Sequence, residues 1–412
     1  MIIKPFLNPF SGFNIESYKD FFGNDTVSSH YNNTNSEQYL KNISERLSVL
    51  LIVDFDSFGG TRRYFYQLKN YYEILKSDVF FAVEPRIIQI TNISSNPDQL
   101  IFLPEWKFKN LCGYFQKFSR FFLFFYYQFI TYIKIQNEVK NKKINLVVIS
   151  TGYGDRYLSI LALNIPCIYI THSIPQKSNN DKIFKLFLKK YLNSHKRIIA
   201  VSEKMKEMID KCWGTEETKN YVTTVYNCSK KIDHSLSYYG TLAYRTTILT
   251  LGHVTWYKNP EFWIKVIECF SIHSQFKDYS WIWAGDGDLL EKCRKTITDK
   301  KITNASFIGY SANVQELYDK ALIYFQPSIL ESFGLSVLDA MQRGIPCVVT
   351  RVGGLPELVI DGETGFIIED GDMKGAVEKI SWLLSHPEES EKMGRAGYLR
   401  YKNLFTEEKW IE

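Results

Sequence analysis

Short apolar runs, rich in β-branched residues, recur along this chain and alternate with segments of helical character. The first run spans residues 47–53, and after Asp54 it is followed by Gly59, Gly60 and a helix-like stretch. Runs of this length without polar alternation are typical of strands that are buried on both faces of a parallel sheet. Strand, glycine loop and helix in this order predict the start of a βαβ crossover.

The alternation occurs in two series that are separated by a polar stretch. Strands are expected at 144–150, 166–171 and 197–201, and then again at 246–251, 281–284, 305–308, 321–325 and 346–350. Each series predicts a doubly wound α/β domain. We therefore expect a polar extension over 1–46, a first domain over 47–228, a linker over 229–244, a second domain over 245–400 and a final helix starting within 401–412.

The length of the chain agrees with two domains, and its net charge bears on whether it binds nucleic acid. Single cores stop growing near about 250–300 residues, and this chain has 412 residues, of which 45% are apolar. Two domains invite a cleft between them. The formal net charge is only +5, which is weak for a dedicated nucleic-acid binder, so no nucleic-acid partner is expected.

The cysteine pattern and the N-terminal segment bear on location. The seven cysteines are scattered and form no C-x-x-C pair, which indicates neither a disulfide framework nor a zinc site and favours a reducing compartment. Pro5 and Pro9 interrupt the N-terminal segment, which lacks the apolar stretch of a secretion signal. A cytoplasmic location is expected, with peripheral contact at the inner face of a membrane left open.

Ligands of doubly wound sheets bind beyond the carboxyl ends of the strands, so the loops after the strands are the candidate sites. Lys258 follows the run at 246–251 and lies just before Pro260, a favoured first residue of a helix. A cation near a helix N-terminus suits a phosphate, although a solvated loop lysine is the simpler interpretation of an isolated lysine. Gly285 and Gly287 follow the run at 281–284 and fit either close approach to a ligand or a plain turn.

The most specific segment follows the run at 321–325. Glu331 lies in the loop, and Phe333-Gly334-Leu335 is predicted to open a helix whose first N–H groups point at that loop. Asp339 lies about two turns further along the same helix, within reach of another part of one long ligand. Taken alone, Asp339 fits an ordinary helix-surface carboxylate equally well.

Residues 305–372 resemble glycosyltransferase family 4, whose members are retaining enzymes of the GT-B fold, with two Rossmann-like domains that face a central cleft. The resemblance rests on Glu331 and Asp339 in a Glu-x7-acid pattern, on the Gly353-Gly-Leu-Pro-Glu357 segment and on a turn and strand at 361–366. Weaker resemblance extends over residues 48–400, including Gly59-Gly60-Thr61, Thr171-His172, Ala200-Val-Ser202 and Gly285-Asp-Gly287.

The resemblance implies a role for each matching position. Lys258 is expected to contact the donor diphosphate and Glu331 the donor sugar, while His172 is expected near the sugar and the acceptor. The other positions are expected to surround the nucleotide: Gly59, Gly60 and Gly285 through close backbone approach, Phe333, Gly334 and Leu335 through their amides, and Asp339 through the ribose hydroxyls. Two positions depart from the family pattern, because His253 stands where many members carry arginine and Asp339 replaces glutamate.

The expected activity is retaining transfer of a sugar from a UDP- or GDP-linked donor to a glycan or lipid-linked acceptor, in polysaccharide or lipopolysaccharide biosynthesis. No metal and no further cofactor are expected, because no Asp-x-Asp motif follows a strand in a suitable context. A catalytically silent subunit or scaffold of a glycan-assembly complex is the alternative. An epimerase or phosphorylase of the same fold fits less well, because the match is to the transferase acid motif.

Residues 114–133 are unusually aromatic, and basic residues flank them. Two interpretations are open. The segment is either a helix that lies on an anionic membrane, with its aromatic side chains in the interface, or a long core helix that packs on the sheet.

Overall fold

The computed structural model describes residues 47–411 except 55–59, 89–92, 95, 106–115, 153–155, 174, 176–180, 230–244 and 272–277. The chain divides into two compact units. The first unit holds the described residues up to Val201 together with Lys206–Val225, and the second holds Ser202–Met205 together with the described residues from Tyr226 onward. The first unit thus ends at Val225, whereas the sequence predicts a first domain that runs to residue 228.

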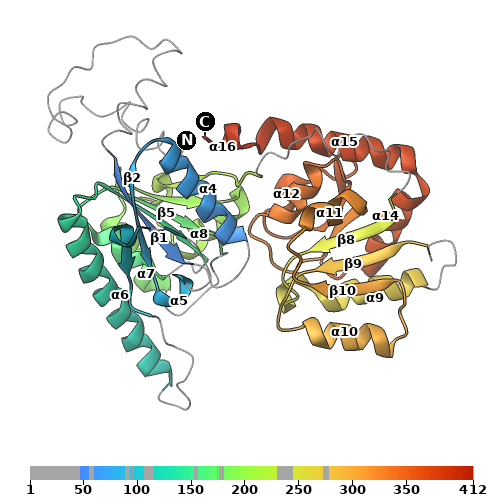
Figure 1. The fold of residues 1–412 in the computed structure, drawn as a ribbon, viewed down its shortest axis with the longest axis horizontal. Coiled ribbons are helices and arrows are strands. Elements are labelled where there is room, and N and C mark those ends of the chain that lie inside the picture. The colour runs from blue at the N-terminus through green and yellow to red at the C-terminus, as the bar shows by residue number, and fades with distance from the viewer. Residues whose placement is uncertain are drawn as a thin grey trace, which may run out of the picture. The chain divides into compact units, whose positions relative to one another are not determined.

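A seven-stranded parallel sheet forms the centre of the first unit (Figure 1). The strand order is β3-β2-β1-β4-β5-β6-β7. The strands are β1 (Ser48–Asp54), β2 (Asp78–Val83), β3 (Leu100–Phe102), β4 (Leu146–Thr151), β5 (Cys167–Thr171), β6 (Lys196–Ala200) and β7 (Val222–Thr224). Order reverses between β1 and β4, so the carboxyl ends of these strands flank a switch point, where ligands of such sheets bind.

Helices join these strands as the crossover rule requires. They are α4 (Gly60–Ile74), α5 (Pro85–Ile88), α6 (Gln116–Asn141), α7 (Asp181–Tyr191) and α8 (Glu203–Cys212), with 3-10 turns η2 (Pro97–Gln99), η3 (Leu158–Ala162) and η4 (Lys219–Tyr221). Helix α4 begins at Gly60 and buries Tyr64, Phe65 and Leu68. The predicted strand and helix at the start of the domain are therefore confirmed, whereas residues 55–59 between them lie outside the described part of the chain.

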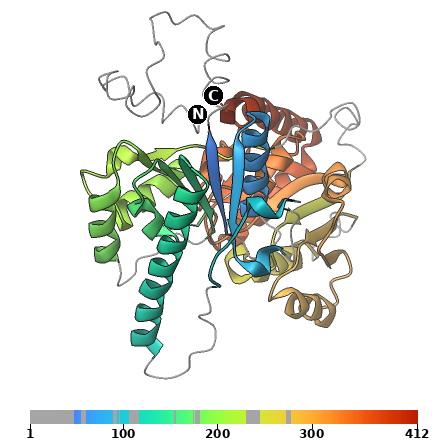
Figure 2. The ribbon, with the colours of Figure 1, turned by 60° about the vertical axis from the view of Figure 1, so that its left-hand side comes forward.

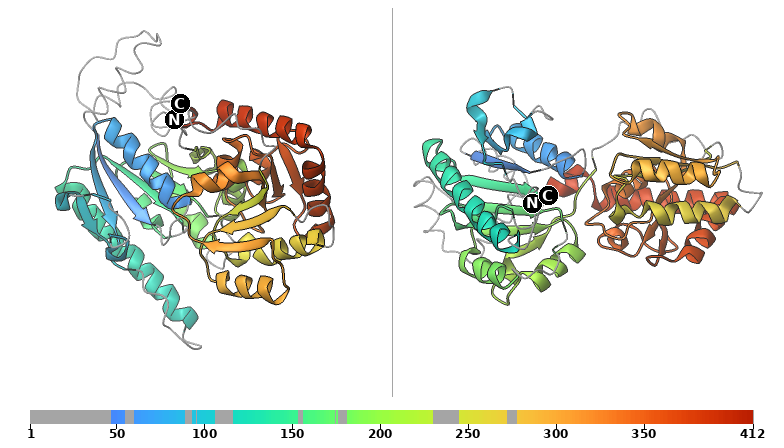
Figure 3. Two further views of the ribbon diagram at one scale, coloured as in Figure 1. Left: turned by 45° about the vertical axis from the view of Figure 1, so that its right-hand side comes forward. Right: turned by 90° about the horizontal axis from the view of Figure 1, so that it is seen from below.

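A six-stranded parallel sheet forms the centre of the second unit (Figure 3). Its order is β10-β9-β8-β11-β12-β13. The strands are β8 (Thr247–Leu251), β9 (Ser280–Ala284), β10 (Ala305–Gly309), β11 (Ala321–Gln326), β12 (Cys347–Thr350) and β13 (Gly365–Ile368). The reversal lies between β8 and β11, which brings the loops after these two strands together.

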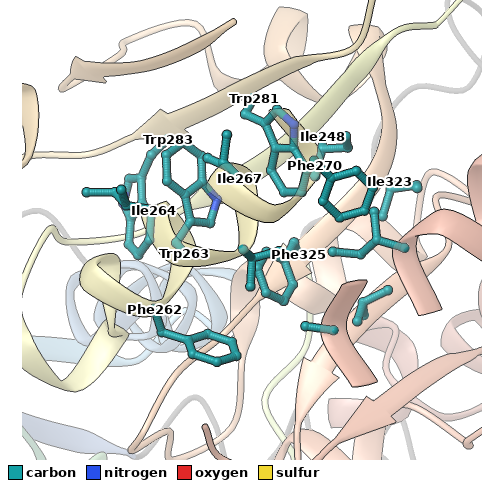
Figure 4. Close-up of a cluster of buried hydrophobic side chains, with 14 of the residues drawn as sticks. Ile248, Phe262, Trp263, Ile264, Ile267, Phe270, Trp281, Trp283, Ile323 and Phe325 are labelled. Atoms are coloured by element: carbon teal, nitrogen blue, oxygen red, sulfur yellow. The ribbon is translucent and has the colours of Figure 1, made fainter. Parts of the chain in front are cut away.

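The helices of the second unit bury a core rich in tryptophan. They are α9 (Pro260–Ser271), α10 (Leu290–Asp299), α11 (Val314–Lys320), α12 (Leu335–Met341), α13 (Leu355–Leu358), α14 (Met373–Ser385), α15 (Pro387–Leu404) and α16 (Glu407–Ile411), with the turn η6 (Trp256–Lys258). Trp263 on α9 lies 6.1 Å from Trp281 and 5.6 Å from Trp283 between ring centroids. Figure 4 shows these three indoles gathered with Phe270 and Phe325 in the core.

The predicted α/β class, with two Rossmann-like units, is confirmed. All strands predicted from apolar runs are present, and β13 begins in the turn and strand that the resemblance implies at 361–366. The sequence did not predict β2, β3 and β7. Strands β3 and β7 have three residues each, which is too short for a periodic pattern. The strand β2 starts with an exposed Asp78 and keeps Phe80 partly exposed, so its apolar run is interrupted.

The aromatic segment falls partly on α6, which has two different faces. Its inner face buries Gln128, Thr131, Ile135 and Val139, whereas large apolar side chains on its outer face are exposed. Neither interpretation of the segment is complete, since the helix both packs on the unit and presents aromatic rings outward. Residues 114 and 115 lie outside the described part of the chain.

Among the described helices, none combines the length and the apolar character that a membrane-spanning segment requires.

Candidate active site

A tight turn after β8 positions Lys258. Gly252 takes a positive φ of 150°, and the turn η6 then ends at Asn259 in the left-handed conformation, with φ 61°. Pro260 begins α9, as the sequence predicts. Asn and Gly tolerate this backbone region better than other residues, so the two positions let the chain leave the strand and present Lys258 just before the helix.

Lys258 and Glu331 form a direct ion pair, with Nζ on Oε2. Their side chains are only 13% and 14% exposed. The Tyr257 carbonyl accepts hydrogen bonds from the amides of Ile329 and Leu330 at 2.8 and 3.2 Å. These bonds connect the turn that carries Lys258 with the loop that carries Glu331. The sequence assigned the two residues to one ligand, and the structure brings them into contact.

Two glycines after β12 hold the Glu331 backbone in place. A Cβ on Gly353 would lie 1.5 Å from the Glu331 carbonyl oxygen, and Gly353 has a φ of 52°. The Gly354 amide donates to the same carbonyl at 3.3 Å. Because any side chain at Gly353 would collide with backbone, this position requires glycine.

Gly285 has a clear structural role at the neighbouring strand end. A Cβ at Gly285 would lie 2.0 Å from the Gly252 carbonyl oxygen, and one at Gly287 would lie 2.3 Å from the Val254 carbonyl oxygen. The Gly252 amide donates to Ala284 at 3.0 Å. These glycines therefore let the loops after β8 and β9 pack backbone against backbone, while the predicted contact of Gly285 with the nucleotide stays a prediction.

Helix α12 begins directly after the glutamate loop. Gly334 caps it in the left-handed region, with φ 107°, and the helix starts at Leu335. The first N–H groups of a helix have no hydrogen-bond acceptor within the helix. The sequence predicts such free N–H groups at this segment. Phe333 itself is buried and packs against Tyr226 and Phe405, at 5.9 and 6.0 Å between ring centroids.

Asp339 lies on α12 and accepts a hydrogen bond from the Ser229 hydroxyl at 2.5 Å. The backbone of Ser229 is held by the end of α15, because its amide donates to the Phe405 carbonyl at 3.3 Å and its carbonyl accepts from the Tyr401 hydroxyl at 3.4 Å. The sequence interpretation placed Ser229 in a linker and missed this contact. No local signal in the sequence marks it.

His253 lies between Gly252 and Val254 at the end of β8, and its side chain is half-buried. Its predicted place at the phosphates stays a prediction.

In the first unit, His172 follows β5 and is half-buried. One ring nitrogen, Nε2, lies 3.1 Å from the Ser150 hydroxyl, and the Tyr64 ring packs edge-on at 4.7 Å. Burial lowers the pKa of His172 from 6.5 to about 3. The imidazole is therefore neutral at pH 7 and can serve a ligand as a hydrogen-bond partner but not as a cation.

The neutral state of His172 predicts a pH effect. Between pH of about 3 and 6.5 the unfolded chain binds a proton at this histidine and the folded chain does not. The free energy of unfolding therefore falls as the pH falls through this range. The slope from this one residue is at most about 1.4 kcal/mol per pH unit. In 13C-histidine NMR, the His172 resonance should stay unchanged from pH 8 to pH 5. The His172→Gln variant identifies the peak, and a midpoint near 6.5 would contradict the prediction.

Gly60 is the first residue of α4 and is exposed. Gly59 lies outside the described residues.

A buried ionic cluster lies at the carboxyl ends of β1, β2 and β4. The Asp54 carboxylate accepts hydrogen bonds from the Arg156 guanidinium at 2.7 Å and from the Thr151 hydroxyl at 2.5 Å. The same guanidinium lies 3.6 Å from the Glu84 carboxylate. Burial raises the pKa of Asp54 to about 6, although Arg156 opposes this. The sequence interpretation noted Asp54 only as the end of a strand, because its partners are distant in the chain.

Glu357, in the glycine-rich segment after β12, caps the N-terminus of α8. Its carboxylate accepts the amides of Glu203 and Lys204, each at 2.8 Å. The Ser202 hydroxyl donates to the Ser332 carbonyl at 2.8 Å and accepts the Met205 amide at 3.1 Å. The family-like motifs around Ser202 and Glu357 thus meet within the second unit.

Within the described residues, no group of three or more histidine, cysteine, aspartate or glutamate side chains is arranged to hold a metal ion.

Two family descriptions match the chain and together span most of it. Residues 58–228 match Glycosyltransferase Family 4, and residues 243–400 match Glycosyl transferases group 1. The first match falls mainly on the first unit, and the second match lies within the second unit.

Individual relatives match shorter stretches. Trehalose synthase of Pyrococcus horikoshii is 38% identical over 124 residues, which is 30% of this chain and 29% of the relative. N-acetyl-alpha-D-glucosaminyl L-malate synthase of Bacillus anthracis is 38% identical over 105 residues, 26% of this chain and 28% of the relative. The chain thus matches less than a third of the length of either protein.

The fold also has solved counterparts. A crystal structure of Anabaena HepE in complex with UDP and glucose superposes with a TM-score of 0.65 at 15% identity, covering 88% of this chain and 96% of that one. The two sheets, the acid motif after β11 and both family matches lead to one conclusion: the chain belongs to the group 1 glycosyltransferases of family 4.

Proposed function

We propose that this chain transfers a sugar from a nucleotide-diphosphate donor to a glycan or lipid-linked acceptor, with retention of the anomeric configuration, in the synthesis of a surface polysaccharide or lipopolysaccharide. The observation that carries the proposal is the shielded Lys258–Glu331 ion pair at the carboxyl edge of the second sheet. The pair joins the cation proposed for the diphosphate to the acid proposed for the sugar.

The pair suggests how the donor enters. A diphosphate that approaches Lys258 offers the ammonium a stronger anionic partner than the single charge of Glu331. The carboxylate is then released to accept hydrogen bonds from sugar hydroxyls. Because the pair is mostly shielded from water, the exchange takes place where charge interactions are strong.

Asp339 is proposed to bind the ribose. The Ser229 hydroxyl donates to Oδ1, and a carboxylate has further lone pairs that can accept ribose hydroxyls. Ser229, held through its own backbone by α15, also orients a side chain that is one methylene shorter than glutamate. The HepE structure with UDP and glucose supports a nucleotide-sugar donor for this fold.

The leaving group is proposed to be stabilised without a metal ion. Negative charge develops on the diphosphate as the bond to the anomeric carbon breaks, and preorganised cations and amides at that point lower the barrier. Lys258 and the amides of Phe333, Gly334 and Leu335 supply these groups, while His253, Gly59, Gly60 and Gly285 are proposed to line the nucleotide.

Retention requires the acceptor to attack from the face that the nucleotide leaves. The acceptor hydroxyl oxygen forms the new bond to the anomeric carbon, and its proton passes to the departing phosphate oxygen. Glu331 positions the sugar, and neutral His172 is proposed to donate or accept a hydrogen bond near the sugar or acceptor.

Nucleotide release tests this proposal. The full chain is incubated with UDP- and GDP-linked sugars, with and without glycan acceptors, and free nucleotide is measured. Release from one donor is expected, it should persist in EDTA, and Lys258→Met should slow it by about 100-fold or more.

Two outcomes would count against the proposal. Release that stops in EDTA and returns with manganese would overturn metal independence. No release from any donor, together with donor binding in calorimetry, would favour a silent subunit of a glycan-assembly complex.

A further inference from the structure

Large apolar side chains lie exposed along one face of α6. They follow a spacing of three and four residues, which places them on one side of a helix. We call them the α6 stripe: Phe122, Phe125, Tyr126, Phe129 and Ile133. They are 38% to 62% exposed, and no charged residue interrupts the helix between the first and the last of them.

The side chains of this face are exposed to solvent, and the helix packs on the first unit through its other side. The opposite face is anchored on η3, where Ser159 donates through its amide to the Gln128 side chain at 3.0 Å and through its hydroxyl to the Gln128 carbonyl at 2.9 Å. Figure 2 shows the part of α6 near its start extending past the strands of the first sheet. Contiguous exposed apolar surface of this kind marks an interaction site.

Cations flank the stripe. Lys140 lies seven residues beyond Ile133, on the same side of α6, and is exposed. The neighbouring helix α7, which contacts α6 through Phe184 and Phe124 at 6.2 Å between ring centroids, exposes Leu186 by 70%.

The exposed face of α7 is itself basic. Lys182 and Lys190 lie four residues before and after Leu186 and are exposed. Lys189 shares this face and pairs with Glu217 at 2.7 Å. On α6, Lys134 lies 3.9 Å from Glu138. Among the side chains of these two helices that the structure describes, five lysines are exposed and Glu138 is the one acidic residue, so the exposed surface of the two helices is positive.

We propose that the α6 stripe, with Leu186 and the lysines around it, docks on an anionic lipid bilayer. Phenylalanine rings and Leu186 would enter the interface, the Tyr126 hydroxyl would stay at headgroup level, and the lysine ammonium groups would meet the lipid phosphates. A second copy of the chain fits this surface less well, because a two-fold contact through the same face would bring its cations together.

Co-sedimentation of the full chain with vesicles tests the docking. Vesicles of phosphatidylcholine alone are compared with vesicles that also contain phosphatidylglycerol, at low and high salt. The wild type should bind the anionic vesicles, and high salt should weaken this binding. Phe125→Ser combined with Phe129→Ser should lower the partition by about tenfold or more, since each ring loses apolar burial in the interface.

Matched variants separate the contributions. Ile74→Ser combined with Phe102→Ser removes two exposed apolar side chains elsewhere in the first unit and should leave binding unchanged. Lys182→Gln combined with Lys190→Gln should weaken binding to anionic vesicles only. The melting temperature of each variant, measured by circular dichroism, should match that of the wild type, which shows that the variant is folded. The single variant Phe129→Ser is a milder change that tests the same surface.

Three outcomes would overturn the docking. The wild type does not bind anionic vesicles at low salt, the stripe variant binds as tightly as the wild type, or light scattering shows a dimer that the stripe substitutions convert to a monomer. These readouts do not depend on the donor chemistry, so they are separate from the test of the proposed function.

Discussion

Replacing Lys258 with methionine is expected to lower kcat/KM for sugar transfer by about 100-fold to 1,000-fold, the range for loss of one preorganised group at a developing anion. Methionine keeps the length and the apolar stem of lysine but removes the charge that faces the diphosphate. Steady-state kinetics with the donor identified by nucleotide release measures the change.

The matched control is Lys292→Met. Lys292 is an exposed lysine of the same unit whose ammonium also pairs with a glutamate, Glu261, at 2.6 Å. Its replacement should leave kcat/KM within about twofold, since an exposed ion pair contributes little. Equal losses in both variants would remove Lys258 from the site.

Glu331→Gln is expected to lower kcat by about 100-fold, while the Kd for the free nucleotide stays the same or falls. Glutamine preserves the shape of the side chain but cannot supply the charge that orients the sugar. It also frees Lys258 from its ion pair, so the diphosphate no longer has to compete for the ammonium. Single-turnover kinetics gives kcat, and titration calorimetry with the nucleotide gives Kd.

Asp339→Asn serves as a control, because it should change the nucleotide Kd more than kcat. Loss of the carboxylate that is proposed for the ribose should raise the nucleotide Kd by about tenfold, the effect of losing a charged hydrogen bond, with a smaller change in kcat. If Glu331→Gln retained wild-type turnover, Glu331 would have no part in the reaction.

The central strands were predictable because their environment is simple. The strand β1 has neighbours on both sides and is almost wholly buried, so its sequence is a continuous apolar run that needs no periodic pattern. The loops that follow such strands were predictable in the same way, and Lys258 and Glu331 each lie in one of these loops. The edge strands β3 and β7 gave no comparable signal, because three residues carry too little pattern.

The partners of the site residues were not predictable. The sequence identified Asp339 as part of an acid motif. It did not predict the hydrogen bond from Ser229, which is 110 residues away in the chain. Asp54 was visible as a strand end, while its ion-pair partner Arg156 lies 102 residues further on. The exposed side of α6 was also undecided, because an all-round apolar segment does not show which side packs on the unit.

The sequence by itself thus determined two α/β units, the strands at their centres and the residues that stand at the ends of those strands, because all three depend on local patterns of apolar and polar residues. Only the tertiary structure decided that Lys258 pairs with Glu331, that Ser229 holds Asp339 and that α6 presents aromatic rings outward. The physical reason is strand order. In a doubly wound sheet β11 lies beside β8, so loops that are 73 residues apart come into contact, and no local pattern encodes which loops will meet.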